Sequence, residues 1–180
     1  MKKIVLTFGL ISGSIISAMM MATLAFQDSI GFDRGEVIGY TSMVLAFLLI
    51  FFGVRSYRDN VAGGTVGFGR ALAVGALISV VASVFYIATW ELIYYKLEPD
   101  FGAKYGAYQV EKARAGGATE EAIAAKKAEM EKFAEMYKNP AVNAALTFLE
   151  PMPVALIVAL VTAGVLSRRK KNPIQETALT

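Results

Sequence analysis

Long apolar stretches separated by short charged segments dominate the hydrophobic pattern of the chain. Four such stretches occur, at residues 4–26, 37–54, 71–97 and 141–166. A helix needs about 20 mostly apolar residues to cross a bilayer core, and each stretch is near or above that length. None of them alternates apolar with polar residues, as the strands of a membrane barrel do. The pattern therefore predicts an all-α integral membrane protein with four transmembrane helices.

Composition agrees with this prediction and excludes several kinds of metal site and catalytic residue. Hydrophobic residues make up 56% of the chain and charged residues 18%, against about 25% charged in soluble proteins. The chain has neither Cys nor His. Disulfides are therefore excluded, zinc, haem and iron–sulfur sites lose their usual ligands, and a Cys nucleophile or His base is not available. We predict a protein without metal or cofactor that is not an enzyme.

Basic residues mark alternate ends of the apolar stretches. They precede the first, lie between the second and third, and follow the fourth: Lys2, Lys3, Arg55, Arg58, Arg70, Arg168, Arg169, Lys170 and Lys171. The connections at 27–36 and 98–139 are acidic or balanced in charge. Since Lys and Arg accumulate in cytoplasmic loops, we predict an inner-membrane protein with both termini in the cytoplasm. The basic residues would also contact lipid headgroups, and they form no basic face for nucleic acid.

The first apolar stretch has a second interpretation. Lys2, Lys3, the apolar run and Ala22–Ala25 resemble a secretory signal peptide. The apolar region of a signal peptide is only about 7–15 residues long, which favours a retained span over residues 4–26. Cleavage after Ala25 would leave the orientation of the other spans unchanged, so loop charge does not decide between the two.

Small residues recur every four positions along three of the predicted spans. The rows are Gly9, Gly13 and Ser17; Gly35 and Gly39; and Gly75, Ser79 and Ser83. Such rows let membrane helices approach closely, so we expect contact faces within one bundle. The alternative is that one row joins two copies of the chain or a second membrane protein.

The segment 98–139 carries both signs of charge and predicts a helical hairpin outside the membrane. Its helices are expected at about 99–114 and 120–138, separated by Gly116 and Gly117. Thr119 is a suitable N-cap for the second helix, and Asn139 followed by Pro140 is a suitable start for the fourth span.

Each helix of this hairpin carries an apolar stripe. Phe101, Tyr105 and Tyr108 share one face of the first helix. A second stripe runs through Met130 and Phe133. The charge balance favours packing of the two stripes on each other. The alternative is that one stripe binds a partner or lies on the membrane.

Two carboxylates fall within the apolar stretches, Glu91 in the third and Glu150 in the fourth. Asn143 and Thr147 share a helix face with Glu150. Pro151 follows at once, so a bend is expected beside Glu150. An ionisable group in a span indicates a functional site, here a paired-carboxylate site for a cation or proton. The alternative is a structural role, in which a protonated Glu shares hydrogen bonds with Tyr or Thr.

Several short motifs resemble a known family. They are Gly53–Asp59 (GVRSYRD), Gly63–Ala71 (GGTVGFGRA), the pair Trp90-Glu91, and Glu150–Val154 (EPMPV). Together they resemble the bacterial family called domain of unknown function 4199, and the resemblance covers essentially the whole chain. It implies a small four-span membrane protein and brings no activity, substrate or catalytic residue with it.

Two functions from different classes fit these observations. The first is a non-enzymatic membrane protein with a scaffolding, accessory or envelope role that acts through its hairpin. The second is a small oligomeric transporter or channel that uses Glu91 and Glu150.

Overall fold

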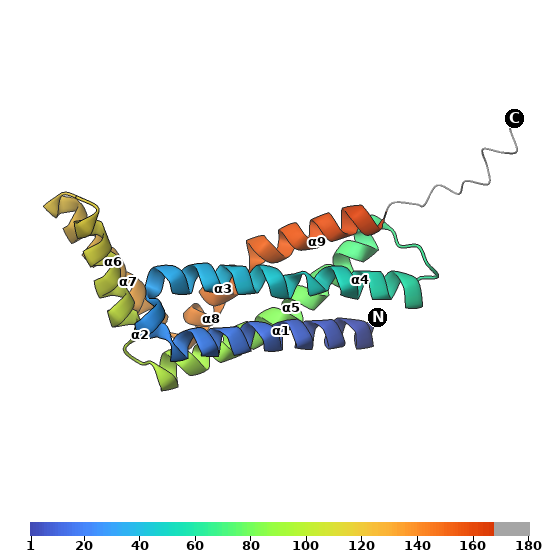
Figure 1. The fold of residues 1–180 in the computed structure, drawn as a ribbon, viewed down its shortest axis with the longest axis horizontal. Coiled ribbons are helices and arrows are strands. Elements are labelled where there is room, and N and C mark those ends of the chain that lie inside the picture. The colour runs from blue at the N-terminus through green and yellow to red at the C-terminus, as the bar shows by residue number, and fades with distance from the viewer. Residues whose placement is uncertain (168–180) are drawn as a thin grey trace, which may run out of the picture.

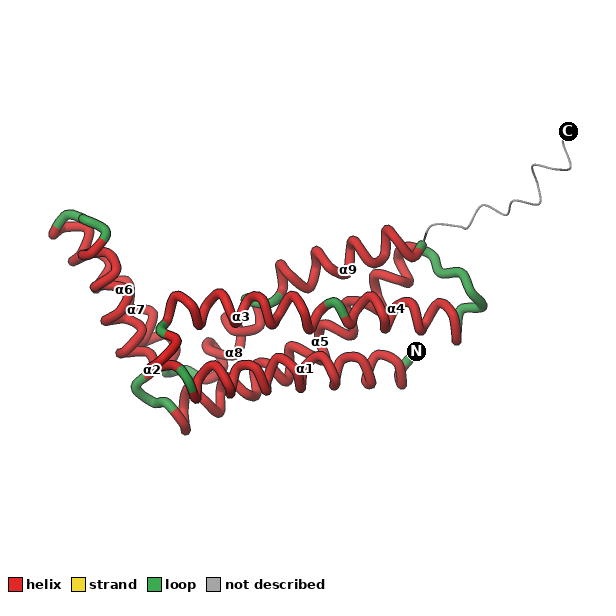
Figure 2. The backbone as a smooth tube through the Cα atoms, in the orientation of Figure 1, coloured by secondary structure: helices red, strands yellow, loops and turns green. Residues whose placement is uncertain are grey.

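Helices make up nearly all of the described structure. The computed structural model describes residues 1–167. Its helices are α1 Lys2–Ala25, α2 Gln27–Ile30, α3 Phe32–Phe47, α4 Leu49–Asn60, α5 Phe68–Leu92, the π-helical η1 Ile93–Leu97, α6 Phe101–Ala115, α7 Glu120–Tyr137, α8 Pro140–Leu149 and α9 Met152–Leu166. This part of the chain contains no strand (Figure 2), so the predicted all-α class is confirmed.

Four segments of this structure are long and apolar enough to cross a membrane. They are Lys2–Ala25, Phe32–Asn60, Phe68–Leu97 and Pro140–Leu166, and they run alongside one another as a bundle (Figure 1). The outer faces of the bundle remain apolar: Val37 is 65% exposed, Leu45 60% and Val161 60%. A soluble protein seldom exposes so much apolar surface, so the bundle indicates a multi-pass membrane protein.

The second span is longer than the pattern predicted. The prediction placed it at residues 37–54, whereas α3 begins at Phe32 and α4 ends at Asn60. Gly31 adopts a positive φ of 75°, which glycine tolerates without strain, and this turn ends α2 and lets α3 begin at once. The acidic Glu36 therefore lies in the first turns of a bundle helix and not in a connecting loop.

The fourth span is interrupted beside Glu150, as predicted. α8 ends at Leu149 and α9 begins at Met152. Pro151 and Pro153 have no backbone N–H to donate, so the hydrogen-bonding ladder cannot continue through them. At the start of the span, the Asn139 side chain accepts a hydrogen bond of 3.0 Å from the backbone N–H of Ala141. The predicted cap is therefore confirmed.

Glycines set the distance between α1 and α5. A Cβ atom on Gly9 would lie 2.6 Å from Val81 Cβ, and one on Gly13 would lie 2.7 Å from Phe85 Cβ. Farther along the same face, Thr89 Oγ1 donates a hydrogen bond of 2.7 Å to Ser17 Oγ. The prediction that this row forms a contact face is confirmed.

The other two rows of small residues differ from each other. Gly75 packs tightly, since an added Cβ would lie 3.0 Å from Ile50 and 3.3 Å from Ala159. Around Gly39, by contrast, an added Cβ would meet no atom within 4 Å. Gly35 and Gly39 line a cavity, so the prediction of a helix contact is wrong for Gly39.

α6 and α7 pack on each other and project from one end of the bundle (Figure 1). We call them the α6–α7 pair. Gly117, with φ 78°, makes the turn between them, and Thr119 Oγ1 caps α7 by accepting from Ala122 N. The aromatic stripe of α6 does not pack mainly on α7 as expected. Its rings surround Phe32 of α3, and the centroids of Tyr105 and Tyr108 lie 5.5 Å and 4.9 Å from that of Phe32.

Candidate functional site

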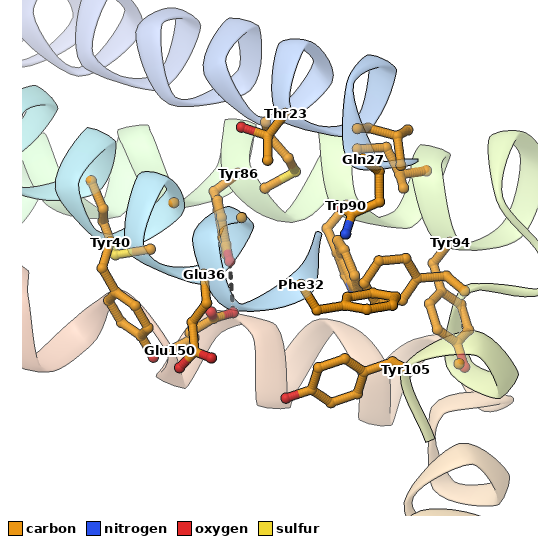
Figure 3. Close-up of a pocket in the computed structure, with 18 of the residues that line it drawn as sticks. Thr23, Gln27, Phe32, Glu36, Tyr40, Tyr86, Trp90, Tyr94, Tyr105 and Glu150 are labelled. Carbon is orange, nitrogen blue, oxygen red and sulfur yellow. Dashed lines mark hydrogen bonds between the residues drawn. The ribbon is translucent and has the colours of Figure 1, made fainter. Parts of the chain in front are cut away.

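A cavity of about 410 Å³ lies where the α6–α7 pair meets the bundle. Its walls come from α1, α2, α3, α5, η1, α6 and α7, together with Glu150 at the break of the fourth span. Most of the lining is apolar or aromatic. The lining residues with polar side-chain atoms, most of which are labelled in Figure 3, are Thr23, Gln27, Glu36, Tyr40, Ser42, Tyr86, Trp90, Tyr94, Tyr105, Tyr137 and Glu150.

Glu150 reaches the cavity because the fourth span is broken at its position. The α8 helix ends one residue earlier, and Pro151 prevents it from continuing. The phenol of Tyr86 donates a hydrogen bond of 2.6 Å to Glu150 Oε2. Tyr86 itself is 8% exposed and belongs to the core of the bundle, so this bond fixes one carboxylate oxygen against a rigid wall. The Glu150 side chain remains accessible from the cavity.

Glu36 is a second carboxylate in the same cavity. It lies on α3, on the face that also carries Gly39 and Tyr40. Figure 3 shows the side chains of Glu36 and Glu150 directed toward the same part of the cavity, from helices far apart in the sequence. Glu36 was not predicted as a site residue, because the charge pattern assigned residues 27–36 to a connection between spans. The spacing of four between Glu36 and Tyr40 is the signal that would have placed it on a helix face.

A hydrogen-bonded network centred on Asn143 supports the wall of the cavity. Asn143 is fully buried, and its Oδ1 accepts from Trp90 Nε1 at 3.1 Å and from Thr147 Oγ1 at 3.0 Å. Its Nδ2 donates to the Tyr95 hydroxyl at 3.4 Å. The network joins α8 to α5 and η1, and it holds the Trp90 ring in the cavity wall.

The four residues predicted as an intramembrane polar site are only partly brought together. Asn143 and Thr147 form the network, and Glu150 lies in the cavity nearby. Glu91 is not among the described residues that line the cavity. It follows Trp90, and neighbouring residues on a helix point about 100° apart. Within residues 1–167, Glu91 Oε1 is buried without a hydrogen-bond partner.

An ion pair and a ring cluster fasten the α6–α7 pair to the bundle. Lys112 Nζ of α6 donates to Asp33 Oδ1 of α3. The hydrogen bond to Asp33 raises the pKa of the Lys112 ammonium above its ordinary value. At the base of α7, burial raises the pKa of the Tyr137 phenol, and the negative charge of Glu150 raises it further.

Three of the arginines predicted to contact headgroups lie in the described structure, and none of the three lines the cavity. Near the end of α4, Arg55 Nε lies 3.6 Å from Asp59 Oδ2, and Arg58 Nε lies 2.7 Å from Asp59 Oδ1. Arg70 is exposed in the first turn of α5. Arg168, Arg169, Lys170 and Lys171 lie outside the described residues.

Comparison with known proteins gives a family and no function. A family model described as "Protein of unknown function (DUF4199)" matches residues 7–168. No curated protein and no solved structure matches the chain.

Proposed function

The chain belongs to the DUF4199 family of proteins of unknown function, and from that premise we propose that it is a non-enzymatic inner-membrane protein that binds a small amphiphilic molecule. The cavity below the α6–α7 pair carries this proposal. Its volume of about 410 Å³ falls within the range of about 300–1,000 Å³ found for ligand pockets. Mostly apolar walls with a few convergent polar groups are the usual construction of such pockets. An accessory or envelope role would then be exercised through the bound molecule.

Binding is favoured over conduction because the bundle is closed beyond the cavity. Phe47, Ile50 and Ile78 are fully buried and belong to the continuous core of the bundle. Ser42 and Met43 are the last residues of α3 that line the cavity, one helical turn before Phe47. A channel would need a polar path past these side chains, and a transporter would need the bundle to open there.

The proposal does not include catalysis. The full chain lacks His and Cys, and residues 1–167 contain no group of three or more metal-ligating side chains. The polar groups of the cavity are carboxylates, phenols, an indole, an amide and two aliphatic hydroxyls, which suit recognition of a ligand. Membrane lipids are the expected surroundings, and neither a cofactor nor nucleic acid has a part in the proposal. A second copy of the chain or another membrane protein is a partner the proposal allows.

We further propose that the α6–α7 pair lies outside the inner membrane and that both termini lie in the cytoplasm. The loop between α4 and α5, which Arg58 and Arg70 flank, lies with the described N-terminus at the opposite end of the bundle from the α6–α7 pair (Figure 1). Positively charged ends are retained on the cytoplasmic side. The cavity would then lie near the outer surface of the membrane, within reach of molecules in the envelope.

Single cysteines test this orientation, since the chain has none of its own. Ala118→Cys and Thr65→Cys place the thiol in exposed loops at opposite ends of the bundle. A membrane-impermeant maleimide is expected to label the 118 variant in intact spheroplasts and the 65 variant only after lysis. The unsubstituted chain should remain unlabelled. Labelling at position 65 in sealed spheroplasts would reverse the orientation.

Filling the cavity tests the binding proposal. Gly39→Phe places a ring where an added Cβ meets no atom within 4 Å, so the bundle can fold around it. The variant is expected to lose the small molecules that remain with the protein through purification in dodecyl maltoside. These are measured by mass spectrometry of an organic extract of the purified protein.

Gly164→Phe is the matched control, because Gly164 is also on a membrane helix with open space around it and does not line the cavity. It should retain the same molecules as the unsubstituted chain. Identical extracts from all three proteins, with no molecule depleted in Gly39→Phe, would contradict the proposal.

A further inference from the structure

We propose, resting on the proposed function, that the cavity selects an organic monocation: an onium head group, such as an alkylated ammonium, on an apolar body. Glu36 and Glu150 supply the opposite charge, and aromatic faces supply the rest of the site.

The charged side chains that line the described cavity are all acidic. Among the described residues that line it, Glu36 and Glu150 are the only charged ones, and none is Lys or Arg. No ion pair within residues 1–167 involves either carboxylate. Two carboxylates that line one mainly apolar cavity repel each other when both are ionised, and a bound cation relieves that repulsion.

The hydrogen bonds of the carboxylates leave them able to bind a cation. Tyr86 donates to Oε2 of Glu150, which holds that side chain in place without adding a positive charge. Glu36 and Glu150 both line the cavity, and their side chains lie near each other in Figure 3. An onium group placed between the two helices would meet negative charge from both α3 and the break of the fourth span.

Aromatic rings crowd the cavity on the side of the α6–α7 pair. The Trp90 and Phe101 rings meet edge to face at a centroid distance of 5.0 Å, and Phe32 and Tyr105 meet in the same way at 5.5 Å. All four residues line the cavity. Ring faces attract a cation within about 6 Å, with tryptophan the strongest, and this is how proteins recognise quaternary ammonium groups.

An inorganic ion fits these walls less well. Ca²⁺ takes about 6–8 oxygen ligands, and Mg²⁺ demands a near-octahedral set. The described cavity offers two carboxylates among mainly apolar side chains, and no cluster of three metal-ligating residues occurs in residues 1–167. An organic cation satisfies both the charge and the apolar surface.

The exposed apolar surface beside the cavity explains why the body of the molecule should be apolar. Tyr40 lines the cavity and is 43% exposed, and Val37, nearly one turn earlier on α3, is 65% exposed. Both residues lie on one of the four segments that are long and apolar enough to cross a membrane. A ligand with its head at the carboxylates can therefore leave its apolar part against the membrane.

Two probes of one shape and opposite charge test the selectivity: tetraphenylphosphonium and tetraphenylborate. The protein is purified in the uncharged detergent dodecyl maltoside. Trp90 is the only tryptophan of the chain and lines the cavity, so its fluorescence reports occupancy. Tetraphenylphosphonium is expected to give a saturable change, and tetraphenylborate none. Calorimetric titration supplies an independent dissociation constant.

Carboxylate variants identify the residues that bind the charge. Glu36→Gln and Glu150→Gln are each expected to weaken phosphonium binding about tenfold, which corresponds to about 1.4 kcal/mol. Glu150→Gln keeps an oxygen to accept from Tyr86. Glu131→Gln removes the same charge from an exposed position on α7 outside the cavity and should leave the dissociation constant unchanged.

Three results would overturn the inference: no saturable phosphonium binding, equal affinity for the two ions, or Glu36→Gln and Glu150→Gln with unchanged affinity. If Glu150→Gln does not fold, Glu36→Gln decides, since Glu36 is exposed on α3. Equal binding of both ions that Gly39→Phe abolishes would leave the binding cavity standing and remove only its charge selectivity. Unchanged molecular extracts from Gly39→Phe would remove the proposed function itself.

Discussion

Replacing Gly13 with leucine is expected to prevent α1 from docking on α5 and to lower the free energy of unfolding by about 3 kcal/mol or more. The Cβ atom alone would lie 2.7 Å from Phe85 Cβ, 2.9 Å from Phe85 Cγ and 3.3 Å from Ala82 Cα. The first and last of these neighbours are fixed to the α5 backbone and cannot rotate away. Relief would need a shift of the whole helix, which would also separate Gly9 from Val81.

Reversible unfolding in mixed dodecyl maltoside and sodium dodecyl sulfate micelles measures this loss. Gly13→Ala is expected to show an intermediate effect of about 1–3 kcal/mol, because its single methyl group already overlaps α5. Gly164→Leu is the control, since an added Cβ there meets no atom within 4 Å. Equal unfolding midpoints for Gly13→Leu and Gly164→Leu would show that α1 and α5 do not meet as described.

Asn143→Leu is expected to cost about 2 kcal/mol and to disturb the cavity wall as well. Leucine has a similar volume, so the loss comes from the hydrogen bonds. The indole N–H of Trp90 and the hydroxyl of Thr147 would both lose the oxygen to which they donate. Leaving a buried donor without a partner costs about 1–3 kcal/mol, and hydrogen bonds between membrane helices average about 0.6 kcal/mol.

Two measurements separate the role of Asn143 from simple loss of stability. Unfolding midpoints give the energy, and the emission maximum of Trp90 reports the surroundings of its ring. Thr147→Val removes one of the two hydrogen bonds to Asn143 Oδ1 and is expected to cost about 1 kcal/mol while leaving the emission maximum unchanged. If Asn143→Leu matched the unsubstituted chain in both measurements, the Asn143 network would neither stabilise the fold nor hold the Trp90 ring in place.

Local features of the fold could be predicted because they depend on neighbouring residues alone. The four apolar stretches locate the spans, since the length of a membrane helix is set by the bilayer. Asn139 and Thr119 cap the helices where they were expected to, since a cap needs only a short polar side chain before the first turn. The break at Pro151 follows from a missing N–H.

The candidate site could be predicted only in part. Asn143, Thr147 and Glu150 were grouped by helical spacing. Thr147 does donate to Asn143, whereas Glu150 lies at the break after α8 and accepts from Tyr86. Glu91 was paired with Glu150 by depth in the membrane. The residues of α5 and η1 that line the cavity are Tyr86, Trp90, Ile93 and Tyr94, and Glu91 lies off that face. Similar depth in the membrane does not bring two side chains together, because the rotation of each helix about its axis decides which way its side chains point.

The sequence by itself determined that the chain is helical, where its four apolar spans lie, and where caps and prolines start or break them. Those properties come from hydrogen bonding within one helix and from the apolar length a bilayer requires. Only the tertiary structure decided that Glu36 joins Glu150 and that the α6 aromatic stripe closes on Phe32. The lipid-facing and core-facing sides of these spans are alike in hydropathy, so hydropathy does not determine which sides meet. Close packing at Gly9 and Gly13 determines how α1 and α5 meet. Packing of this kind determines which side chains line the cavity.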